Sequence, residues 1–294
     1  MSSKITKVNK TSKPSKSMQS MQDMNNIISG SNTLLKLFCC LTIIVLICIL
    51  IGNYAFKNGL LTCDHYVFNT YLYIILAILL CFMVVLINDQ TGAFNSLLIW
   101  MVQGNIVRII MFFIAILIIY FALIYALFKV DPTNILASNA IWFLLIFMLG
   151  FILIPTIWLG RLTDVIGLAG ILTIIITIIV GLAGYYYGDK IITFDWDYYL
   201  YIALWCLIIV IIIGSMLITD PATMTIFFYI ISIISLLIFI LLLLSNHKKL
   251  RENSEKCIDG KVVPNYPVES INIFIKILNI FTDLIRILSR LKRK

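Results

Sequence analysis

Six polar or charged side chains recur at regular intervals through the apolar stretch that closes the chain. Their spacing alternates between four and three residues, which places all of them on one face of a helix. They are Asn272, Lys276, Asn279, Asp283, Arg286 and Arg290. Such a set can make hydrogen bonds and ion pairs, but each charge costs roughly 2.5–3.5 kcal/mol at the middle of a membrane. The pattern leaves three arrangements open: the stripe faces the interior of a helix bundle, the helix dips into the membrane and returns, or it lies in the interface as an amphipathic helix.

The rest of the chain offers few residues suited to catalysis. Its two histidines are His65 and His247, and no pattern typical of a nucleophilic triad, a metalloprotease, a phosphate-binding loop or a dinucleotide site occurs. The cysteines and histidines also lack the spacing of a zinc site. Asp189, Asp195 and Asp197 could attract a divalent cation, although a solvated acidic loop is the favoured interpretation. The sequence therefore predicts no enzymatic activity, no cofactor and no metal site.

The composition excludes an ordinary soluble domain. Of 294 residues, 62% are hydrophobic and 12% are charged, with a mean hydropathy of +1.05, whereas soluble domains carry about 25% charged residues. Apolar runs long enough to cross a bilayer occupy 34–55, 67–88, 106–128, 141–159, 165–187, 198–219 and 222–245. We predict an all-α polytopic membrane bundle of seven spanning segments, plus the C-terminal helix. Residues 1–33 are predicted to be a disordered basic tail, and 34–294 to be the transmembrane domain.

Small residues line one face of the fifth segment. Gly170, Thr173, Thr177, Gly181 and Gly184 recur at helical spacing. In lipid, small side chains allow two helices to approach closely. The stripe predicts a packing face rather than the lining of a pore.

The stretch from Ser270 to Phe281, SINIFIKILNIF, resembles the closing motif of the Bax inhibitor (TMBIM, transmembrane Bax inhibitor motif) family. That motif runs roughly Ala-Leu-Asn-Leu-Tyr-x-Asp-Ile-Ile-Asn-Leu-Phe, and Asn272, Asn279 and Phe281 match it. The order of the upstream features is also similar, so the resemblance covers about 67–290, with 34–55 as an additional N-terminal segment. It implies a protein of an internal membrane, such as the endoplasmic reticulum or Golgi, that leaks calcium or protons or modulates cell death.

Two departures fall on the family's sensing device, which is a pair of aspartates on the last two helices. The resemblance places Asn246 and Lys276 at those positions. An aspartate pair can titrate and bind a divalent ion, whereas an amide and an ammonium group cannot replace it. One hypothesis is a rebuilt sensor that uses Asp283 beside Lys276, with His247 as the titrating group. The alternative is that Lys276 only fixes the bundle through a hydrogen bond or an ion pair.

A second function is therefore left open beside the ion leak: a non-conducting structural or scaffolding membrane protein. The heavy use of Ile, Lys and Asn is typical of an AT-rich genome, such as that of a large DNA virus. For a viral protein, the expected location is the viral membrane. A secondary transporter is disfavoured because paired broken helices are missing. The expected partners are the lipid bilayer and, through the basic tails, anionic headgroups. The sequence shows no basic surface with aromatic platforms, so we do not expect nucleic-acid binding. It assigns no protein partner.

Basic residues give the prediction of topology. Their distribution is most asymmetric if the terminal helix dips in and returns, which favours a cytosolic C-terminus beside a cytosolic loop 246–267 and leaves the N-terminus open. Cys63 and Cys257 would then face a reducing compartment. Since disulfides persist in oxidising compartments, we expect none between them.

Overall fold

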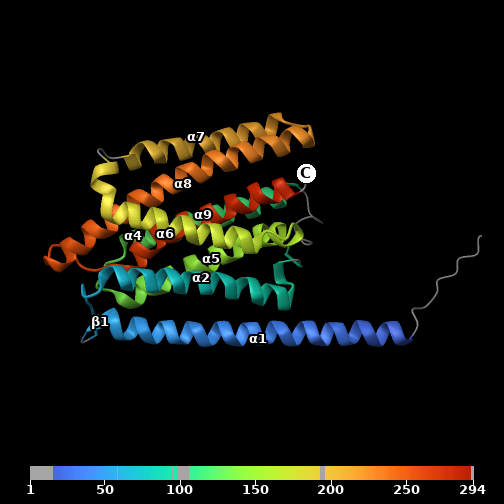
Figure 1. Cartoon of the computed structure of the whole chain (residues 1–294), viewed down its shortest axis with the longest axis horizontal. Helices are drawn as coiled ribbons and strands as arrows, with labels where there is room; N and C mark the ends of the chain where they lie inside the picture. The colour runs from blue at the N-terminus through green and yellow to red at the C-terminus, as the bar shows by residue number, and fades with distance from the viewer. Residues whose placement is uncertain (1–15, 58, 95, 98–105, 193–195, 293–294) are drawn as a thin grey trace, which may run out of the picture.

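The computed structural model describes residues 16–57, 59–94, 96–97, 106–192 and 196–292, and helices dominate them (Figure 1). The helices are α1 (Lys16–Tyr54), α2 (Tyr66–Thr91), α4 (Ile106–Lys129), α5 (Ile135–Leu162), α6 (Ile166–Ile191), α7 (Trp196–Leu217), α8 (Pro221–Ile258) and α9 (Tyr266–Lys292). A two-stranded antiparallel hairpin, β1 (Phe56–Lys57) and β2 (Leu60–Leu61), joins α1 to α2. The predicted all-α bundle is confirmed.

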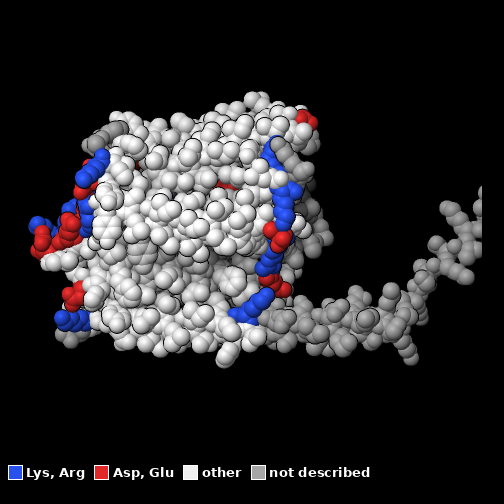
Figure 2. Space-filling model, in the orientation of Figure 1, with Lys and Arg blue, Asp and Glu red and all other residues white. Residues whose placement is uncertain are grey.

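The surface is organised as a membrane protein requires. Figure 2 shows Lys, Arg, Asp and Glu gathered at the two ends of the bundle, with a broad uncharged belt between them. Among the described residues, six helices are long and apolar enough to cross a bilayer: α1, α2 and α5 to α8. The remaining expected segment, 106–128, corresponds to α4, of which Ile114–Lys129 is a shorter apolar part.

Two helices extend further than the apolar runs. Helix α1 begins at Lys16, within the predicted tail, and residues 1–15 lie outside the described part. Helix α8 continues to Ile258, so Asn246 and His247 lie inside a helix rather than in the predicted loop. The residues after Ser245 lose hydropathy but include no Gly or Pro before Gly260. The fall in hydropathy therefore marks the edge of the uncharged belt, not the end of the helix. The helix continues because the residues that follow tolerate a helical backbone.

Helix α9 is enclosed by other helices along the whole length of the bundle. It packs against α2, α5, α6 and α8, and more lightly against α4. At its start, Trp142 Nε1 donates to Ser270 Oγ at 2.9 Å, and near its end Thr163 Oγ1 and Ser289 Oγ share a hydrogen bond of 2.8 Å. Helices α5 and α9 thus run parallel from one end to the other. The favoured re-entrant arrangement is wrong, and so is the surface helix, because α9 is unbroken and buried.

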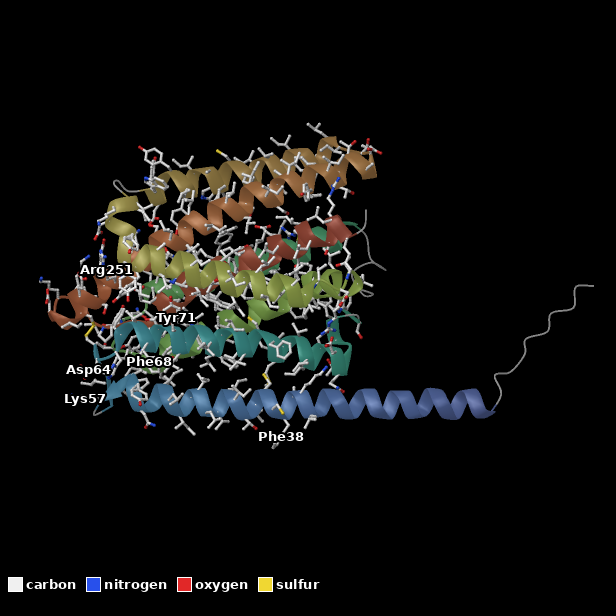
Figure 3. The ribbon with its side chains drawn as sticks, in the orientation of Figure 1. Phe38, Lys57, Asp64, Phe68, Tyr71 and Arg251 are labelled. Carbon is white, nitrogen blue, oxygen red and sulfur yellow. A yellow bond between two sulfur atoms is a disulfide. The ribbon has the colours of Figure 1, made fainter. Side chains whose placement is uncertain are left out.

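One end of the bundle holds a disulfide, and we call it the disulfide end. Cys63, just after the hairpin, is bonded to Cys257 at the end of α8. Figure 3 places Lys57, Asp64 and Arg251 at this end. The expectation that Cys63 and Cys257 are free thiols is therefore wrong. It depended on the re-entrant arrangement of the terminal helix, which placed both cysteines on the cytosolic, reducing side. The opposite end, where α5 and α9 finish, we call the carboxyl end.

The small-residue face of α6 packs against α8, as predicted for two of its glycines. A β-carbon at Gly181 would lie 3.0 Å from His247 Nε2, and one at Gly184 would overlap the Leu244 carbonyl oxygen and lie 2.9 Å from His247 Cβ. A β-carbon at Gly170 would meet nothing within 4 Å. The close approach of α6 to α8 therefore needs glycine at 181 and 184, but not at 170.

Replacing Gly184 by alanine tests this contact. Gly184→Ala should lower the free energy of unfolding by about 1–3 kcal/mol, because the Leu244 backbone cannot move aside without separating the helices. Gly170→Ala is the matched control and should leave stability unchanged or raise it slightly, since alanine favours a helix over glycine. Thermal unfolding in detergent, followed by circular dichroism, measures both. Equal effects from the two variants would contradict the assigned contact.

Candidate functional site

The polar stripe of α9 faces the bundle interior over most of its length. Lys276 and Asp283 are buried, whereas Asn272 and Asn279 are half-buried. Arg286 is exposed, with its Nη1 3.5 Å from Asp283 Oδ1. Of the three arrangements that the sequence left open, the structure has the one in which the stripe faces other helices.

Asn246 and Lys276, the positions that the resemblance assigns to the family's aspartates, lie on the packed helices α8 and α9. Asn246 on α8 donates from Nδ2 to the carbonyl oxygen of Asn272 on α9 at 2.9 Å. Asn272 lies one helical turn before Lys276. The bundle thus brings Asn246 next to the first part of the stripe, but it supplies an amide and an ammonium group where a divalent ion would need carboxylates.

Lys276 places a positive charge in the centre of the protein. Only 6% of the residue is exposed, and no carboxylate oxygen of the described residues lies within 4.0 Å of its Nζ. Asp197 attracts this charge from further away, and Lys249 repels it. A buried cation without a contact partner is costly, so Lys276 is a constraint on what can enter the core.

His247 is held by two hydrogen bonds in the core. Nδ1 lies 2.8 Å from the Leu243 carbonyl oxygen and Nε2 lies 2.7 Å from the Tyr71 hydroxyl. A carbonyl only accepts, so Nδ1 carries a proton and, in the neutral ring, Nε2 accepts from Tyr71. Among the described residues, no hydrogen bond or ion pair joins His247 to Asp283 or to Lys276. The rebuilt sensor stays a prediction.

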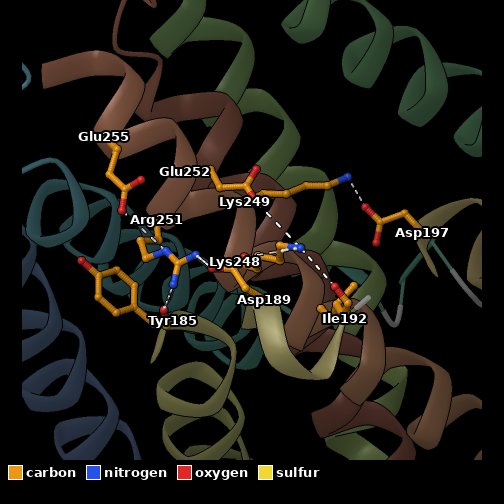
Figure 4. A network of polar contacts seen from close by, with 9 residues as sticks. All are labelled: Tyr185, Asp189, Ile192, Asp197, Lys248, Lys249, Arg251, Glu252 and Glu255. Atoms are coloured by element: carbon orange, nitrogen blue, oxygen red, sulfur yellow. Dashed lines mark hydrogen bonds and ion pairs between the residues drawn. The ribbon is translucent and has the colours of Figure 1, made fainter. Parts of the chain in front are cut away.

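A network of ion pairs at the disulfide end was not predicted (Figure 4). Asp189 at the end of α6 pairs with Arg251 and lies 3.5 Å from Lys248, while buried Asp197 at the start of α7 pairs with Lys249. Asp195 lies outside the described residues. The acidic loop was therefore interpreted without its partners. The sequence signal for the network is the cluster of three bases just beyond the apolar part of α8. In the structure these bases face two carboxylates.

This network leaves little negative charge for a divalent cation. Lys248 also donates to the Ile192 carbonyl oxygen at 3.2 Å, and Arg251 donates to the Tyr185 carbonyl oxygen at 3.0 Å. The bases thus tie α8 to the end of α6 through the backbone as well as through Asp189. The arrangement fixes the geometry of this end of the bundle.

Comparison with known proteins tests the resemblance. The family model described as "Inhibitor of apoptosis-promoting Bax1" matches residues 63–293. The chain belongs to the Bax inhibitor family. The match begins after α1, so this helix is an addition to the part that defines a Bax inhibitor. The search of curated proteins finds no match.

Replacing Lys276 by methionine tests whether its charge is a burden on the fold. Lys276→Met keeps a long unbranched side chain and removes the buried charge, so stability should rise by about 1 kcal/mol or more. Lys256→Met, on the exposed surface of α8, is the control and should stay within about 0.5 kcal/mol of the parent. Thermal unfolding in detergent measures both variants. A clear loss of stability in Lys276→Met would mean that the ammonium group has a stabilising partner.

Proposed function

We propose that this Bax inhibitor family protein modulates cell death from within a membrane and does not conduct calcium by the family's aspartate-based route. The observation that carries the proposal is the buried ammonium group of Lys276 on α9, with Asn246 beside it on α8. Neither residue supplies the carboxylate on which calcium binding in the family depends. A non-conducting scaffold within the membrane is the activity that this core supports.

The size of the electrostatic effect favours this choice over a calcium leak. A lysine charge about 8 Å away repels a divalent cation by roughly 4 kcal/mol at an effective dielectric constant of 20. That repulsion lowers the local concentration of calcium by roughly a thousandfold, since 1.4 kcal/mol corresponds to a factor of ten. The carboxylates of Asp189 and Asp197 offset little of it, because they are already paired with Arg251 and Lys249.

Calcium efflux from reconstituted vesicles tests the proposal. Vesicles that contain the protein should lose calcium no faster than empty vesicles. The double variant Asn246→Asp with Lys276→Asp restores the two carboxylates and should increase efflux at least tenfold. Asn53→Asp with Lys256→Asp is the control, because it adds the same charges at exposed positions outside the core. Rapid efflux from the unmodified protein would overturn the proposal in favour of a cation leak.

We also propose that the carboxyl end faces the cytosol and the disulfide end faces an oxidising lumen, as in the endoplasmic reticulum or Golgi. The Cys63–Cys257 bond supports this orientation, because disulfides persist outside the cytosol. The described start of α1 and the end of α9 share the carboxyl end (Figure 1). The lysine-rich N-terminal tail and the basic C-terminus thus join the bundle at the same end, and this concentration of basic residues supports a cytosolic side for it. The loop 246–267, which the sequence placed in the cytosol, would then lie in the lumen.

Counting reactive thiols and protease protection test the orientation. The denatured, unreduced protein should react with maleimide at five cysteines, and at all seven after reduction. In Cys63→Ser the count should be six under both conditions. In sealed microsomes, protease should remove a C-terminal tag and spare a tag placed between α8 and α9. Seven reactive thiols before reduction, or protection of the C-terminal tag, would contradict the orientation.

A further inference from the structure

A cavity of about 280 Å³ lies between α4, α5 and α9, away from the Asn246 and Lys276 positions. The lining residues of α9 recur at three- and four-residue spacing, so they belong to one face of that helix. Those residues are Ile275, Leu278, Asn279, Thr282 and Arg286. The volume is close to the lower limit of ordinary ligand pockets, which begin at about 300 Å³.

The lining changes from apolar to polar along the bundle. Because α5 and α9 run parallel, Thr156 and Thr282 lie nearer the carboxyl end than Leu149 and Ile275 do. The structure gives neither threonine hydroxyl a hydrogen-bond partner among the described residues. One end of the cavity therefore suits a hydrocarbon chain, and the other suits a polar group.

The cavity borders the surface that contacts lipid. Leu117 on α4 is 53% exposed and Ile152 on α5 is 44% exposed, and both line the cavity. They also belong to the uncharged belt of apolar segments. A molecule from the surrounding bilayer can reach the cavity sideways, without passing through water.

Arg286 supplies a charge at the polar end. Its side chain is 53% exposed, and its only ion pair among the described residues is the 3.5 Å contact of Nη1 with Asp283, which is at the limit of a hydrogen bond. Its other N–H groups are free to form the fork that binds phosphate oxygens. Arg290, one turn further, packs over the Tyr229 ring on α8 at 5.1 Å and adds positive charge without entering the cavity.

The depth of Arg286 matches a lipid headgroup. Lys292, which closes α9, lies 3.1 Å from Asp164 Oδ2 at the carboxyl end. Six residues separate it from Arg286, or about 9 Å along the helix axis. A long arginine side chain at that depth extends to the headgroup region.

We propose that this cavity binds one anionic phospholipid, with an acyl chain among the apolar residues and the phosphate on Arg286. Basic pockets between membrane helices bind such headgroups. The site differs from the basic tails, which contact headgroups at the membrane surface, because it holds a chain and a phosphate together. It does not depend on whether the protein moves ions.

Lipid retention tests the site directly. The detergent-purified protein is incubated with phosphatidylserine or phosphatidylcholine of identical chains, and bound lipid is measured by native mass spectrometry. Phosphatidylserine should be retained about tenfold more strongly, because its headgroup keeps a net negative charge beside Arg286, whereas the choline ammonium group of phosphatidylcholine neutralises the same phosphate. Glycerophosphoserine, the headgroup without chains, should not displace it. Equal retention of the two lipids, or displacement by the headgroup alone, would overturn the proposal.

Two cationic side chains of equal exposure give a matched comparison. Arg286→Gln should reduce retention of phosphatidylserine to the level of phosphatidylcholine. Lys292→Gln removes one charge from a side chain that is also 53% exposed and does not line the cavity, so retention should persist. Equal losses would show that general attraction, rather than this site, holds the lipid.

A third variant tests the hydrocarbon part of the cavity. Ile152→Trp enlarges a side chain at the exposed edge of the cavity without entering the buried core, so the fold should survive, as thermal unfolding will check. The larger ring should exclude the acyl chain and reduce retention of both lipids at least fivefold. Unchanged retention would mean that the chain lies elsewhere and would overturn the proposal.

Discussion

The enclosure of α9 is the constraint on which the rest of the structure depends. Its polar stripe cannot face lipid without large costs, so other helices must surround it and supply partners. Trp142 on α5 and Thr163, directly after α5, hold its two ends, and Asn246 on α8 holds its first turns. The other helices therefore have to be arranged around a helix that is too polar to cross a membrane alone.

This constraint connects the fold of the family to the activity of this member. Asn272 contacts α8 through its backbone carbonyl and Asn279 bonds the Ile275 carbonyl of its own helix, whereas Lys276 changes the electrostatics without breaking the helix. The distant Asp197 attracts the buried ammonium group and offsets part of the cost of its burial. Helix α9 thus keeps its place in the bundle with an ammonium group buried near its middle.

The sequence predicted the features that depend on a single helix. Long apolar runs predicted the helices, the 3–4 spacing predicted the stripe, and small residues predicted the contact face of α6. Gly181 and Gly184 confirm that face, whereas Gly170 has open space, because spacing shows only which residues share a side. Features that depend on two helices could not be predicted. The partner of Lys249 and the Cys63–Cys257 bond both require knowing which segments meet in space.

Helix α9 follows all of the described helices that enclose it, and this order has a consequence for biosynthesis. The seven described helices before it are made first, and its 27 residues take roughly 1–5 s to synthesise at 5–20 residues per second. During that time the nascent bundle contains a vacant slot lined by polar groups that later bind α9. Assembly of this bundle therefore includes a docking step that follows the synthesis of α9, and quality control in the membrane has a defined window in which to recognise chains whose α9 has not docked.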